Sequence, residues 1–200
     1  YGVTADMEST RRWLDGCFVR ELSRIPSNFR CQGTIQDFLK NHDIPGIAGI
    51  DTRALRKILR EKGTMNGMIT ANENYQIEAV IPKLKAYRTG NVVDQVTCQT
   101  ASLLNGKGKK VALLDLGAKK NIAKSLQQRG CEVAIYPART LAEEILGGNP
   151  DGIMLSNGPG DPKECKEIIQ EIQKLYASGT PVFAICLGHQ LMALANGADT

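Results

Sequence analysis

Short apolar runs alternate with amphipathic stretches over residues 111–195, and this alternation limits the fold more than any other feature. Apolar runs bounded by Gly, Pro or Asn predict buried strands, and apolar residues at helical spacing predict the helices between them. Strands are predicted at 111–116, 132–136, 152–156 and 181–185, and helices at 118–129, 140–146, 165–176 and 187–195. Because strands that alternate with helices through short connections form right-handed βαβ units, we predict an α/β fold with a parallel sheet flanked by helices.

The pattern divides the chain into a first domain at 1–88, a linker at 89–108 and a second domain at 109–200. The linker is polar and rich in Gly and Lys, with one short strand predicted at Val92–Val93. In the first domain, Thr34 and Asp51 are predicted to cap two helices.

The first of these helices runs to Lys40. The second has an apolar face that includes Leu55 and Ile58, and Gly63 is its stop signal. Asn66-Gly67 predicts a hairpin turn.

Composition and charge argue against several classes of function. The 25 basic and 21 acidic residues leave a net charge of +4, without a long basic run or aromatic interleaving, so we expect no nucleic-acid binding. No apolar stretch reaches the ~18 residues of a membrane span. The six cysteines form no C-x-x-C pair and the only histidines are His42 and His189, so we expect no metal site. Without a signal pattern or starting Met at Tyr1, we expect a piece of a longer cytoplasmic protein.

Cys186 ends the last predicted strand and is followed at once by a helix. This is the layout of a nucleophile elbow, in which a sharp turn presents the side chain at the rim of the sheet. The flanking residues Ala184 and Gly188 are small, as such a turn requires, and the N–H of Leu187 would face an oxyanion formed on attack. Taken alone, the pattern fits a buried structural cysteine equally well.

A glycine-rich loop at the end of the preceding strand changes that balance. The segment Ser156-Asn157-Gly158-Pro159-Gly160-Asp161-Pro162 follows the strand at 152–156. Two glycines around a proline give a rigid loop whose amides can approach a ligand closely. Since ligands bind beyond the carboxyl ends of parallel strands, the loop and the elbow together predict a site there.

With these two signatures, the chain resembles the class I glutamine amidotransferases. More narrowly, it resembles the family of small, glutamine-hydrolysing subunits of carbamoyl phosphate synthetases. The narrower likeness rests on the glycine loop itself, on the segment 115–122 and on residues 49–53 and 60–63 of the first domain. The resemblance covers essentially the whole chain and implies a partial N-terminal small-subunit domain and a truncated amidotransferase domain.

The resemblance also implies roles for individual residues. Cys186 would attack the side-chain amide of L-glutamine to form a thioester, with release of ammonia and then of glutamate. The N–H groups of Leu187 and Gly160 would form the oxyanion hole. Gly158, Gly160, Leu187 and Gln190 match positions that contact glutamine.

Partners and cofactors follow from the same resemblance. A large subunit would form a heterodimer or higher assembly with this one and receive the ammonia. It would use ATP, Mg and bicarbonate to make carbamoyl phosphate for arginine and pyrimidine biosynthesis. We expect no cofactor on this chain itself.

Two departures from the family pattern bear on function. The family usually has Gly where this chain has Ala184, and we expect the elbow to survive, slightly more crowded. The family's base is a His followed two residues later by Glu, and no such pair follows Cys186 here. His189 lies one helical turn after Cys186, and we expect it to play a structural role rather than act as the base. Two alternatives remain: a different class I amidotransferase, or a non-catalytic module that only docks to the large subunit.

Overall fold

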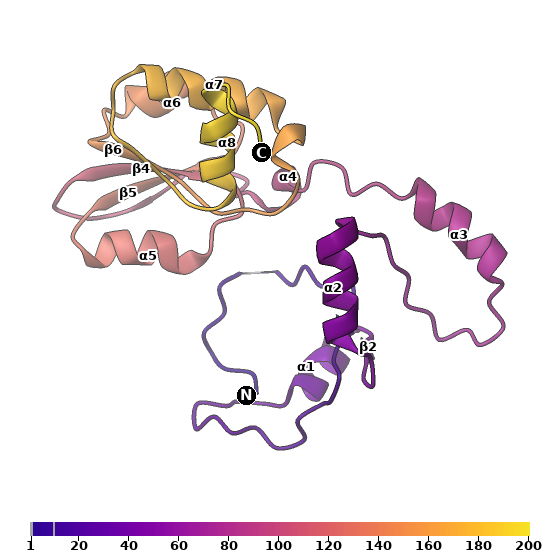
Figure 1. Cartoon of the computed structure of the whole chain (residues 1–200). Helices are drawn as coiled ribbons and strands as arrows, with labels where there is room; N and C mark the ends of the chain where they lie inside the picture. Colours follow the sequence, from indigo (N-terminus) through magenta and orange to yellow (C-terminus); the bar gives the residue numbers. More distant parts are fainter. Residues whose placement is uncertain (1, 10) are drawn as a thin grey trace. The chain divides into compact units, whose positions relative to one another are not determined.

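A computed structural model describes residues 2–9 and 11–200 of the chain (Figure 1). The chain divides into two compact units, residues 1–88 and 89–200. Over the described residues, none of the helices combines the length and the apolar character that a bilayer span requires.

The first unit holds three helices, α1 (Ile35–Asn41), α2 (Thr52–Lys62) and α3 (Ile77–Ala86), among the residues described. Strand β1 (Cys17–Phe18) pairs in parallel with β2 (Gly46–Ile47). Both predicted caps are confirmed, since the side chain of Thr34 accepts from the N–H of Asp37 and that of Asp51 from the N–H of Ala54.

The hairpin predicted at Asn66-Gly67 is wrong, because neither flank is a strand. The Asn66 amide instead donates to the carbonyls of Leu84 and Tyr87, at 2.7 and 3.1 Å. These carbonyls belong to the last turn of α3 and the residue that caps it, so Asn66 satisfies acceptors that a helix end leaves unpaired.

The second unit contains a five-stranded sheet in the order β3-β5-β4-β6-β7. Strands β4 (Lys110–Asp115), β5 (Glu132–Pro137), β6 (Gly152–Leu155) and β7 (Val182–Ala184) are mutually parallel. The predicted α/β class and parallel sheet are therefore confirmed. Strand β3 (Ser102–Leu104) adds an antiparallel edge against β5 that the sequence pattern did not indicate.

Helices cover both faces of this sheet (Figure 1). They are α5 (Lys120–Gln128), α6 (Ala142–Gly147), α7 (Lys166–Ala177) and α8 (Leu187–Ala195), with a 3-10 turn η1 (Pro162–Glu164) before α7. Alternate strand residues enter two cores. Ala112 and Leu114 join the larger core with α6, α7 and α8, whereas Leu113 joins the smaller core with Ala123 of α5.

The strand predicted at Val92–Val93 is also wrong, because this segment forms the short helix α4 (Val93–Val96). The Asn91 side chain accepts from the N–H of Val93 at 3.1 Å, which favours a turn over an extended chain. Val93 is only 1% exposed and belongs to the larger core. The segment expected as a linker thus contributes a helix and an edge strand to the second unit.

Helix α8 packs so closely on β6 that position 188 has no room for a side chain. A Cβ at Gly188 would lie 2.7 Å from both Cβ and O of Leu155 and 2.8 Å from O of Ser156. We therefore expect Gly188→Ala to lower the free energy of unfolding by about 1–3 kcal/mol, as overpacking does, measured by urea denaturation.

The matched control is Gly147→Ala at the end of α6, where no atom lies within 4 Å of the added Cβ. There the unfolding free energy should stay the same or rise, because Ala is the better helix residue. Equal values for the two variants would contradict the close packing of α8.

Candidate functional site

A sharp backbone turn carries Cys186 between β7 and α8. Pairing with β6 continues one residue past β7, where the N–H of Ile185 donates to O of Leu155 at 3.0 Å. Cys186 then has φ 51° and ψ −111°, and α8 begins at the next residue. A positive φ is tolerated by Asn or Asp but strains a cysteine by roughly 1–3 kcal/mol. The turn has the geometry expected of an elbow, and it leaves Cys186 exposed.

Neighbouring backbone groups hold this turn in place. The N–H of Gly188 donates to O of Ser156 at 3.1 Å, and the N–H of Gln190 donates to O of Cys186 at 3.0 Å. With Ala at position 184, β7 still reaches that residue and the turn still forms. The elbow is thus fixed to the end of β6 by hydrogen bonding as well as by packing.

The glycine-rich loop lies against both the elbow and the end of β4. A Cβ at Gly158 would lie 2.1 Å from O of Leu116 and 2.7 Å from Cδ2 of Leu187. Only glycine fits at 158, and the loop therefore contacts the first residue of α8. Gly160 has φ +95°, a conformation that favours glycine, and Asp161 then caps η1 by accepting from the N–H of Lys163 at 2.9 Å.

A buried carboxylate shapes the end of β4 beside this loop. Asp115 accepts from the N–H groups of Cys98, Gly117 and Ala118, at 2.8, 2.9 and 2.6 Å. The hydroxyl of Thr97 donates to O of Asp115 at 2.6 Å. These bonds fix the turn at Gly117, whose φ is +110°.

Side chains of the glycine loop complete the connection to β4. The Ser156 hydroxyl is fully buried, accepts from the N–H of Leu116 at 2.9 Å and donates to O of Asn157 at 2.8 Å. The Asn157 amide accepts from the N–H of Lys119 at 3.2 Å and donates to O of Gly117 at 3.3 Å. The ends of β4, β6 and β7 therefore form one hydrogen-bonded surface.

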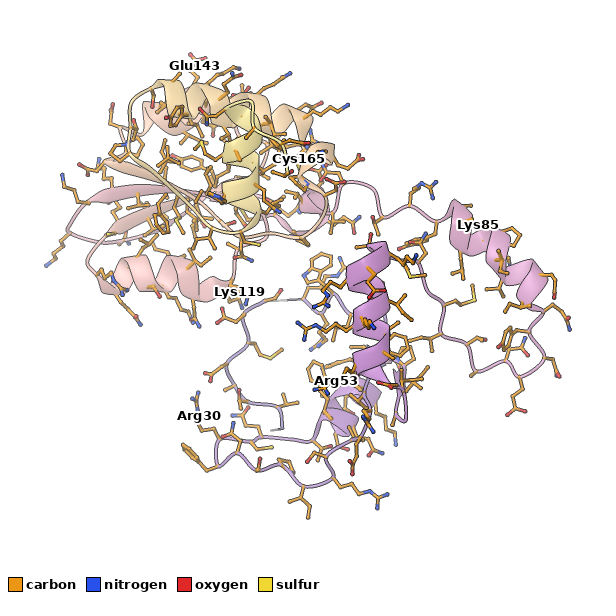
Figure 2. All side chains as sticks on the ribbon, viewed as in Figure 1. Arg30, Arg53, Lys85, Lys119, Glu143 and Cys165 are labelled. Carbon is orange, nitrogen blue, oxygen red and sulfur yellow. The ribbon has the colours of Figure 1, made fainter. Side chains whose placement is uncertain are left out.

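Two other cysteines of this unit differ from Cys186 in their surroundings. Burial, together with the charge of Asp115 and a hydrogen bond to it, raises the pKa of Cys98 to about 11. Burial also raises the pKa of Cys165, which is 3% exposed and precedes α7 (Figure 2). Both thiols are held in the neutral form, which is the unreactive one.

Of the residues expected to form the site, the structure brings Gly158 and Leu187 into contact. Leu187 is buried, whereas Gly160, His189 and Gln190 are exposed. Over the described part of the chain, no hydrogen bond joins His189 to the Cys186 thiol. Within residues 2–9 and 11–200, no three His, Cys, Asp or Glu side chains gather in a group that could hold a metal ion.

Sequence reasoning missed the supporting residues around the site, namely Asp115, Thr97 and the valines of α4. An aspartate directly before Leu116-Gly117 at the end of a strand was one available signal, since such a carboxylate can accept from the following amides. Asn91, two residues before Val93, was another, since it favours a turn at the start of α4. Thr97 gave no signal, because its partners lie elsewhere in the sequence.

Comparison with known proteins identifies both parts of the chain. Residues 112–200 match the family model of glutamine amidotransferase class-I. Residues 1–69 match that of the carbamoyl-phosphate synthase small chain, CPSase domain.

Curated relatives agree over the whole chain. The carbamoyl phosphate synthase small chains of Listeria monocytogenes serotype 4b and Clostridium perfringens are 47% and 43% identical over 202 and 201 residues. That of Streptococcus mutans is 45% identical over 202 residues. These alignments cover 100% of this chain but only 55%, 57% and 55% of the relatives, so the chain spans little more than half their length. The chain belongs to the family of carbamoyl phosphate synthase small chains, and its residues 112–200 belong to the class I glutamine amidotransferases.

Proposed function

We propose that this chain carries the nucleophile and the oxyanion-binding loops of a glutaminase that serves carbamoyl phosphate synthesis. The observation that carries the proposal is the strained, exposed Cys186 at the start of α8, beside the glycine loop. A thiol at this position is accessible to substrate, and backbone strain persists where the surrounding structure enforces it.

In the proposed reaction the Cys186 sulfur attacks the side-chain amide carbon of L-glutamine. The carbonyl π electrons move to oxygen, and the N–H groups of Leu187 and Gly160 stabilise this oxyanion. The intermediate collapses as the C–N bond breaks, and the nitrogen takes up the proton given up by the thiol and leaves as ammonia. Water then adds to the thioester, the C–S bond breaks, and glutamate and the thiol are released.

Recognition of glutamine is assigned to Gly158, Gly160, Leu187 and Gln190. Because Gly158 and Gly160 carry no side chains, their amides can approach the ligand directly. Gln190 lies one turn along α8 from Cys186 and exposes an amide that can donate to or accept from the ligand. We assign no base role to His189.

The partner proposed for the whole protein is a large synthase subunit that consumes the ammonia. That subunit would bind ATP, Mg and bicarbonate, while this chain needs no cofactor for amide hydrolysis through a thioester. The assembly would act in the cytoplasm and supply arginine and pyrimidine biosynthesis. A different class I amidotransferase is disfavoured by residues 1–69, which match the small-chain model. A module that only docks to the large subunit would show no glutamine-protected labelling of Cys186, which the first test measures.

The first test uses the chloroketone analogue of glutamine, which alkylates thiols. At pH 8 we expect it to label Cys186 ahead of the other five cysteines, since Cys186 is exposed and the raised pKa of Cys98, about 11, keeps that thiol neutral. Peptide mass spectrometry would locate the label, and excess L-glutamine should slow it.

Two controls make this test specific. L-asparagine, one methylene shorter, should protect at least several-fold less well than L-glutamine. Cys186→Ser should remove the glutamine-protected label while leaving labelling of Cys17 and Cys31 unchanged. Labelling that L-glutamine does not slow would overturn the proposal for this chain.

The second test measures glutamate release from L-glutamine by the chain alone, beside Cys186→Ser. We expect the two rates to be equal, because His189 is exposed and makes no hydrogen bond to the thiol, and because loss of a general base costs about 10²–10⁴-fold. Cys186-dependent turnover would contradict this expectation, and His189→Gln would then identify or exclude that side chain as the base.

A further inference from the structure

Helix α4 lies beside the turn at Gly117, next to the proposed glutamine loop, although it belongs to a segment expected to be a linker. It is four residues long, and a helix of that length has no stability of its own in water. Its position therefore depends entirely on contacts with the rest of the second unit.

We propose that α4 positions the glycine-rich loop. Val92, Asp94 and Val96 fix the position of α4 and thereby that of the Gly160 amide. Support of the loop by α4 does not depend on the function of the chain. The expected effect on glutamine binding rests on the function proposed above.

Two valines place the α4 segment beside glycines of the site. A Cβ built at Gly160 would lie 3.6 Å from Cβ of Val92, the residue that caps α4, so Val92 borders the space next to Gly160. A Cβ built at Gly117 would lie 2.7 Å from Cγ2 of Val96 and 2.9 Å from Cδ of Pro159. Val96 of α4 and Pro159 of the glycine loop therefore both approach the bare Gly117 backbone so closely that a side chain there would have no room.

Charged side chains fasten α4 at its outer surface. The Arg139 guanidinium donates to both oxygens of Asp94, at 2.7 and 2.8 Å, and also pairs with Glu167 of α7. The hydrogen bond from Arg139 lowers the pKa of Asp94, so its carboxylate is charged at neutral pH. A two-bond fork of this kind fixes orientation as well as distance, which a single surface ion pair does not.

The other end of α4 is tied to β4 and to the residue after β5. The Thr97 hydroxyl donates to O of Asp115 and accepts from the N–H of Ala138 at 2.9 Å, and the N–H of Cys98 donates to the Asp115 carboxylate. Both ends of α4 are therefore anchored. Ser156 and Asn157 hold the start of the glycine loop to β4, whereas Gly158 and Gly160 have no side chains of their own, and Val92 lies beside Gly160.

The test compares the unchanged chain with Arg139→Gln and, without any change of charge, Val96→Ala. In both variants we expect the backbone amide resonances of Gly117 and Gly160 to shift in ¹H–¹⁵N NMR spectra. The glutamine concentration that half-protects Cys186 from the chloroketone should rise about tenfold, since small misplacements of binding groups are costly. Iodoacetamide does not bind to the glycine loop before it alkylates a thiol. The rate at which it alkylates Cys186 should therefore change less than about twofold, since no binding group is misplaced for this reagent.

Two control variants separate positioning from general destabilisation. Lys109→Gln removes another exposed ion pair of the same unit, to Asp151 beside the start of β4, and should leave the resonances and the glutamine dependence unchanged. Asp94→Glu keeps the carboxylate opposite Arg139 and should remain close to the unchanged chain.

The outcomes are distinguishable. Unshifted Gly117 and Gly160 amides in both Arg139→Gln and Val96→Ala overturn the proposal, whatever the chemistry of the site. Shifted amides with unchanged glutamine protection overturn the link between α4 and substrate. If L-glutamine gives no protection even in the unchanged chain, the proposed function fails, and the amide resonances alone decide whether α4 supports the loop.

Discussion

The close approach of backbone to backbone at the carboxyl end of the sheet is the constraint on which the rest of the site depends. At Gly158 and Gly188 a Cβ would collide with the main chain of β4 or β6 or of the residues that directly follow them. Because protein interiors are close-packed, the loop, the elbow and the strand ends cannot shift independently of one another. The exposed thiol and the loop beside it are consequences of this fit, since the strained turn at Cys186 persists only because its neighbours fix both of its ends.

Buried polar groups around the site reinforce this packing. Asp115 and Ser156 lie in the interior, yet each is hydrogen-bonded to backbone groups of adjoining loops. In the described part of the chain, no buried side-chain nitrogen or oxygen lacks a partner. Because an unpaired buried polar group costs more than a typical hydrogen bond contributes, such a network favours one arrangement of the loops over others.

Sequence patterns predicted the second unit well and the first unit only locally. The strands β4 to β7 and their helices were predictable because each carries its own apolar period, and Thr34 and Asp51 were predictable because a cap acts on residues three positions away. The errors at Asn66 and at Val92–Val93 have a shared cause. Asn66 bonds to carbonyls 18 and 21 residues further on, and α4 is held by Arg139 and Ala138, more than 40 residues away.

By itself, the sequence determined the α/β class, the position of Cys186 at a strand–helix junction and the glycine loop before it, because these follow from local periodicity and side-chain size. Only the tertiary structure decided that β3 forms one edge of the sheet, that Asp115 joins two loops and that α4 lies against Gly117 and near Gly160. These features depend on partners that are distant in the chain. Local propensity carries no information about such partners until the sheet has brought them together.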